Sequence, residues 1–159
     1  MRSRADSAAN AIILHAGLCC SIVVSQYALH SLEFSFPWQP HPLSLIMLAG
    51  SIVFAVQEFG LFGLWYGISA ILQQLTILSV AFLLLQFLPL TVVLLLVVPV
   101  FAAGHAWEFR GRRLKIILVS LWGVVSIMLF ALQPDVYFLS AAHTLLGTVG
   151  IRRSILYVG

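Results

Sequence analysis

Residues 59–107 read FGLFGLWYGISAILQQLTILSVAFLLLQFLPLTVVLLLVVPVFAAGHAW, and this stretch of 49 residues contains no Asp, Glu, Lys or Arg. One bilayer crossing by a helix needs about 20 predominantly apolar residues, so the stretch is long enough for two membrane spans in succession. The hydrophobic core of a soluble protein does not need an uncharged run of this length. The sequence therefore predicts an integral membrane protein.

The composition of the whole chain agrees with a membrane location. Of its 159 residues, 62% are hydrophobic and only 8% are charged, whereas soluble domains carry about 25% charged residues. So little polar material remains that we expect one transmembrane helical domain over residues 1–159. The net charge of +3 comes from small basic clusters beside apolar runs. Such clusters are typical of topology determinants, and we expect no nucleic-acid partner.

Charged residues and turn residues divide the chain into apolar segments. We expect six membrane spans, at about residues 9–32, 43–66, 68–87, 90–106, 115–132 and 136–151. Arginines precede the first span as in a signal peptide, but no small-residue cleavage site follows, so we expect this span to be retained. The turn between the second and third spans is predicted either at residues 65–67 or at residues 57–60. The last segment is short for a crossing, which leaves four or five spans as the alternative.

The basic residues predict the orientation of these spans. If the N-terminus is cytoplasmic and the chain crosses six times, all eight Lys and Arg lie on the cytoplasmic side, as the positive-inside rule requires. The basic residues after the first span, which could also hold the headgroups of membrane lipids, are Arg110, Arg112, Arg113, Lys115, Arg152 and Arg153. The predicted fold class is an all-α polytopic transmembrane helix bundle with both termini cytoplasmic. The expected location is the bacterial inner (plasma) membrane.

Polar residues inside apolar segments are candidates for a functional site. Glu58 would lie about two turns inside the membrane if the second span ended at residues 65–67, and it could then relay protons, bind a cation or pair with a buried basic group. If the chain turned near Gly60, Glu58 would instead be a solvated carboxylate. Nearby glutamines could line a conduction path or bond helices to one another, and these are Gln57, Gln73 and Gln74.

Five histidines are many for a chain with so few polar side chains. Two of them, His15 and His30, would lie about 22 Å apart along one helix. Histidines at this spacing can ligate haem b in each leaflet if another helix supplies the opposite ligands, and His105 could oppose His15. His143 lies near the middle of the last segment. No spacing is diagnostic of a metal site, so we expect no cofactor and keep haem as an alternative.

Glycines after Glu58 favour close packing of helices. Gly60, Gly63 and Gly67 occur within eight residues, and the last two have the small-x-x-x-small spacing at which membrane helices approach closely. The pattern is frequent in membrane helices, so it does not identify a partner.

The absence of phosphate-binding and nucleophile–base motifs argues against an enzyme. The favoured hypothesis is a small non-catalytic membrane subunit that assembles with other integral membrane proteins or with itself as a homo-oligomer. The alternatives are a channel or transporter subunit that uses Glu58, and a haem-binding electron carrier.

Overall fold

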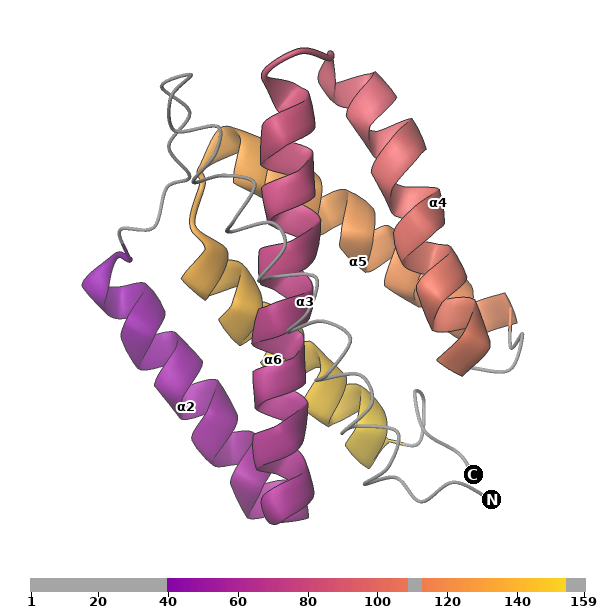
Figure 1. The fold of residues 1–159 in the computed structure, drawn as a ribbon. Helices are drawn as coiled ribbons and strands as arrows, with labels where there is room; N and C mark the ends of the chain where they lie inside the picture. The colour runs from indigo at the N-terminus through magenta and orange to yellow at the C-terminus, as the bar shows by residue number, and fades with distance from the viewer. Residues whose placement is uncertain (1–39, 109–112, 154–159) are drawn as a thin grey trace. The chain divides into compact units, whose positions relative to one another are not determined.

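The computed structural model describes residues 40–108 and 113–153. These residues form five α-helices and no strand, which confirms the all-α prediction for this part of the chain (Figure 1). The helices are α2 (Pro42–Phe59), α3 (Leu61–Leu85), α4 (Leu90–Glu108), α5 (Arg113–Leu132) and α6 (Val136–Arg152). The first predicted span, residues 9–32, lies outside the described residues.

Three of the described helices, α2, α3 and α5, are long and apolar enough to cross a membrane. They support the predicted membrane location. The apolar part of α4, Leu90–His105, is shorter, and α6 has only 17 residues. A helix of that length rises about 25 Å, less than the roughly 30 Å of a hydrocarbon core. The helix lengths therefore do not support the predicted count of six spans.

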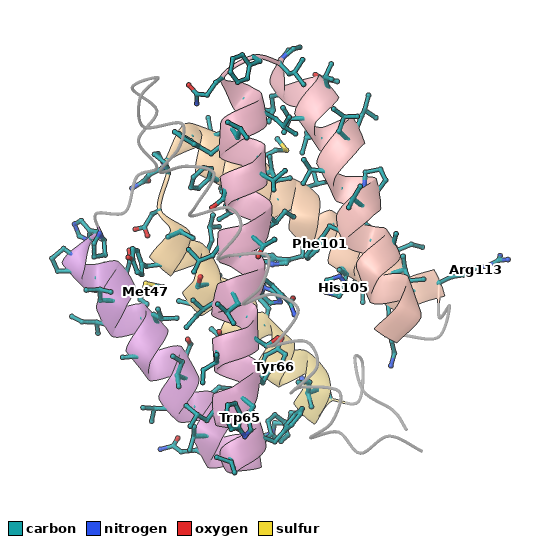
Figure 2. All side chains as sticks on the ribbon, in the orientation of Figure 1. Met47, Trp65, Tyr66, Phe101, His105 and Arg113 are labelled. Atoms are coloured by element: carbon teal, nitrogen blue, oxygen red, sulfur yellow. The ribbon has the colours of Figure 1, made fainter. Side chains whose placement is uncertain are left out.

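The boundary between the second and third predicted spans lies at Gly60 and not at residues 65–67. Gly60 has φ 59° and ψ −136°, a conformation that glycine adopts readily because it lacks a Cβ atom. Its N–H donates to the carbonyl oxygen of Val56 at 2.7 Å, and α3 begins at the next residue. Trp65 and Tyr66 lie within α3 (Figure 2). The segments expected at 43–66 and 68–87 are thus helices at 42–59 and 61–85.

The described helices belong to two compact units. Unit 1 contains α2, residues 61–76 of α3, and α6, whereas unit 2 contains the rest of α3, α4 and α5. Within unit 1, α2 packs against α6 along its length. Ser44 contacts Asp135 at the N-terminal ends of these helices, and Glu58 contacts Arg152 near their C-terminal ends. Helices α2 and α6 therefore run parallel.

The α2–α3 hairpin is packed so closely that backbone touches backbone. A Cβ atom built on Gly63 would lie 1.9 Å from the carbonyl oxygen of Ala55, closer than any real Cβ contact. At Gly67 the nearest atom to such a Cβ would be Cγ1 of Ile52, at 3.1 Å. Glycine at position 63 thus allows the two helices of the hairpin to approach as closely as they do.

Unit 2 is held together by aromatic and small side chains. Helix α4 packs against α5, and Gly123 of α5 lies against the ring of Phe101, where an added Cβ would be 3.1 Å from Cδ1. The rings of Phe82 and Phe130 meet edge to face with their centroids 6.4 Å apart. These contacts connect the C-terminal part of α3, α4 and α5 within one unit.

Candidate functional site

Glu58 forms an ion pair with Arg152 at the C-terminal ends of α2 and α6. The distance from Nη1 of Arg152 to Oε1 of Glu58 is 2.9 Å, and the side chains are 61% and 24% exposed respectively. A carboxylate near a helix C-terminus faces the negative end of the helix dipole, which is unfavourable, whereas an arginine there is favourable. The guanidinium of α6 therefore compensates the carboxylate of α2.

This position corresponds to the predicted turn near Gly60 and not to a site two turns inside a span. Glu58 lies two residues before the turn, and its neighbour Gln57 is exposed. Gln73 and Gln74 lie 13 and 14 residues beyond Gly60 in α3, which is about 20 Å along the helix axis. The four residues predicted as one intramembrane site are therefore divided between a helix end and the middle of a helix.

Unit 1 contains a polar cluster formed by the buried Gln74 and the half-buried His143 and Tyr66. Nε2 of Gln74 lies 2.9 Å from Nδ1 of His143. This hydrogen bond joins the amide of Gln74 on α3 to the imidazole ring of His143 on α6. Tyr66 meets His143 edge to face, with ring centroids 6.5 Å apart. The hydrogen bond between Gln74 and His143 connects α3 to α6 near the midpoint of both helices.

Gln74 is fully buried, yet only half of its amide is hydrogen-bonded. Its Oε1 atom has no hydrogen-bond partner among the described residues. A buried carbonyl oxygen without a donor costs about 1–3 kcal/mol. Gln73 is also buried, and it donates to Oγ of Ser69 in its own helix at 3.1 Å. Of the two glutamines, Gln74 is thus the one that reaches another helix.

Tyr66 was not among the predicted site residues. Its hydroxyl lies against Gly147 of α6, where an added Cβ would be 1.6 Å from the phenolic oxygen. Helical spacing could have indicated this cluster, because Tyr66 and Gln74 are eight residues apart and His143 and Gly147 are four apart. Each pair therefore lies on one face of its helix.

A third polar contact joins the N-terminal ends of α2 and α6. Asp135 is the N-cap of α6, and its Oδ1 accepts from the backbone N–H groups of Tyr137 and Phe138 at 3.0 and 2.9 Å. Its other carboxylate oxygen accepts a hydrogen bond from the hydroxyl of Ser44 on α2. The carboxylate of Asp135 thus accepts from two N–H groups in the first turn of α6, which have no partner within the helix, and also binds α2 through Ser44.

Of the four histidines predicted as possible haem ligands, the structure describes His105 and His143. His15 and His30 lie outside the described residues. The Nδ1 atom of His105 lies 2.9 Å from the carbonyl oxygen of Phe101, over whose ring it also packs (Figure 2). His143 uses its Nδ1 for Gln74. Among residues 40–108 and 113–153, no group of three or more His, Cys, Asp or Glu could hold a metal ion.

The predicted basic residues have different environments. Arg113, Arg152 and Arg153 are exposed, whereas Lys115 is buried, with 8% of its surface accessible. Arg110 and Arg112 lie outside the described residues.

Three polar contacts thus connect helices of unit 1 at one end, at the middle and at the other end. Their chemistry is that of hydrogen bonds and one ion pair between neighbouring helices. Comparisons with protein-family models, with curated proteins and with solved structures find no match for this chain.

Proposed function

We propose that this chain is a small non-catalytic membrane subunit that assembles with other integral membrane proteins or with copies of itself. The observation that carries the proposal is that polar side chains of unit 1 bond its helices to one another. Glu58, Gln74 and Asp135 all contact residues of another helix within unit 1. Side chains engaged in this way stabilise the protein's own helices, and they are typical of a structural role in a membrane.

The surface of α5 is suited to contact with apolar partners. Its exposed side chains recur every three or four residues, which gives one continuous apolar face. These residues are Leu114, Leu118, Leu121, Val125, Met128 and Leu132. Lipid tails cover such a face equally well, so the test must measure assembly directly.

Purification from the native membrane in mild detergent provides that test. We expect the purified particle to be larger than one 17.5 kDa chain in a detergent micelle. Mass spectrometry of the particle should identify either a second membrane protein or further copies of this chain. A monodisperse monomer that retains no partner would contradict the proposal. An absorption spectrum of the same sample tests the haem alternative, because a haem protein would show a Soret band.

We further propose a topology of six crossings with both termini cytoplasmic. The support is the parallel direction of α2 and α6, because two parallel membrane helices require an odd number of crossings between them. Either α3 alone or α3, α4 and α5 together meet this requirement, and we choose three crossings because a single crossing would leave Arg113 on the outer side. With α2, α6 and the predicted span at residues 9–32 the total is six, and the cytoplasmic side then holds Arg113, Arg152 and Arg153. This orientation is also the support for a bacterial inner membrane.

Labelling with a membrane-impermeant maleimide tests this topology. Single cysteines would be introduced in a background in which Cys19 and Cys20 are serine. We expect Gln57→Cys and Arg153→Cys to react from one side of the membrane, and Gln133→Cys to react from the other. Reaction of the variants at positions 57 and 153 from opposite sides would contradict the parallel arrangement of α2 and α6.

A channel or transporter subunit is the second candidate, and one observation favours it. The half-satisfied amide of Gln74 lies beside His143 in the middle of α3 and α6, where a polar path through a membrane would pass. In this alternative the polar residue that lines the path is Gln74 and not Glu58, because Glu58 forms an ion pair with Arg152 at the ends of α2 and α6. Flux in proteoliposomes should be lost in Gln74→Leu and retained in the matched control Gln73→Leu. Equal flux in both variants would exclude a path at Gln74, and flux retained in Glu58→Gln would exclude Glu58 as the ion site.

A further inference from the structure

The C-terminal end of α6 carries two adjacent arginines, which a single carboxylate opposes in the part of the chain that the structure describes. Arg152 is the last residue of the helix, and the backbone N–H of Arg153 caps it by donating to the carbonyl of Val149 at 3.0 Å. Both arginine side chains are exposed, although Ile151 directly before them is 6% exposed and belongs to the core. The polypeptide thus changes from buried apolar to exposed basic within one residue.

Glu58 balances only part of this charge. It contacts one of the guanidinium nitrogens of Arg152, whose guanidinium has five N–H donors in total. The side chain of Arg153 makes no hydrogen bond or ion pair with any residue that the structure describes. Among residues 40–108 and 113–153, one carboxylate therefore pairs with one of two neighbouring guanidinium groups, which leaves donors of both for an anion.

Outward-facing leucines precede these arginines on the same helix. Leu145 and Leu146 are 45% and 57% exposed, and each lies seven residues before one of the arginines. Seven residues are about two helical turns, so leucine and arginine lie on one face. This face is apolar toward the middle of α6 and basic at its end. A phospholipid has matching groups in the same order, because its acyl chains lie toward the middle of the bilayer and its anionic phosphate lies at the surface.

We propose that Arg152 and Arg153 bind the phosphate of an anionic phospholipid, and that Glu58 competes with this phosphate for Arg152. The acyl chains lie along Leu145 and Leu146. Guanidinium groups suit this ligand because they form paired hydrogen bonds with phosphate oxygens. The inference does not depend on assembly with a partner, since all the residues involved belong to unit 1.

Lipid retention by the full-length protein in nanodiscs tests the proposal. Native mass spectrometry would compare phosphatidylglycerol with phosphatidylcholine. We expect Arg153→Gln to weaken the preference for phosphatidylglycerol about fivefold, the effect of one basic residue near a membrane surface. Glu58→Gln should strengthen the preference by a similar factor because it releases Arg152. The matched variant Arg113→Gln removes the same charge from α5 and should weaken the preference less than Arg153→Gln does.

Three outcomes would overturn the proposal. An equal loss in Arg113→Gln and Arg153→Gln would mean that only overall charge matters. A preference that is unchanged or weaker in Glu58→Gln would refute the competition, and this result can be read even if the arginine variant does not fold. Displacement of phosphatidylglycerol by inorganic phosphate at low concentration would identify a phosphate site without a lipid.

Discussion

Replacing Gly63 with alanine tests the packing of the α2–α3 hairpin most directly. The new methyl group would lie 1.9 Å from the carbonyl oxygen of Ala55, whereas real Cβ atoms essentially never come within 3.0 Å of another heavy atom. The difference requires a shift of at least about 1.1 Å between two backbones. Neither backbone can avoid the contact by changing a rotamer, so the two helices must separate.

The expected loss of stability follows from this shift. Overpacking of a close contact typically costs about 1–3 kcal/mol, and a clash with backbone belongs at the upper end of that range. Alanine has a higher helix propensity than glycine by about 1 kcal/mol, which offsets part of the cost. The net expected loss for Gly63→Ala is therefore about 2 kcal/mol. Unfolding by SDS in mixed micelles, followed by circular dichroism, measures this difference.

Two other glycines of the same hairpin provide controls. At Gly50 an added Cβ meets nothing within 4 Å, so Gly50→Ala should be neutral or stabilising. At Gly67 the nearest atom is a side-chain atom, Cγ1 of Ile52 at 3.1 Å, so the stability of Gly67→Ala should lie between those of the other two variants. If Gly63→Ala proved as stable as Gly50→Ala, the close approach of α2 and α3 would be wrong.

Other contacts of unit 1 give three further predictions. Arg152→Gln should lower the free energy of unfolding by no more than about 1 kcal/mol, because its ion pair with Glu58 is partly exposed. Salt screens such a pair, so the loss should disappear at high salt concentration. A loss that does not depend on salt would argue against the ion pair. Gly147→Ala forces the ring of Tyr66 to move, so the free energy of unfolding in SDS should fall by about 1–3 kcal/mol. Adding Tyr66→Phe removes the hydroxyl and should recover part of this stability. No recovery in the double variant would mean that the strain lies elsewhere. Asp135→Ala removes the N-cap of α6 and should cost about 1–2 kcal/mol, with faster hydrogen exchange confined to the first turn of α6; unchanged exchange there would contradict the capping role.

Features that depend on nearby residues were predictable from the sequence. The uncharged stretch at residues 59–107 identifies membrane helices because apolar length is a local property. Pro89 and the Gln133–Asp135 turn similarly mark where helices begin and end, and those boundaries agree within one or two residues with α4, α5 and α6. The turn at Gly60 was harder to locate. Three glycines lie close together in the sequence, and nothing in it indicates which of them takes a positive φ.

Contacts between distant segments were not predictable in the same way. Glu58 and Arg152 are 94 residues apart, and no periodic pattern connects them. Pairing them requires knowing that α2 and α6 are parallel neighbours in register. The contact of Gln74 with His143 depends likewise on the relative register of α3 and α6. The sequence therefore indicated the polar residues themselves, whereas their partners came from the packing of the helices.

The parallel pairing of α2 and α6 has a consequence for biogenesis. Ser44 and Asp135 are 91 residues apart in the chain, so α2 leaves the ribosome long before its neighbour is made. Residues 77–134, which make up unit 2, are synthesised entirely within that interval. During translation the hydroxyl of Ser44 cannot donate to the carboxylate of Asp135 until that residue has been synthesised. The packing of α2 against α6 in unit 1 is completed only after α6 has been made. The contacts of α2 within unit 1 are therefore completed only after α6 has been synthesised, more than 90 residues later in the chain.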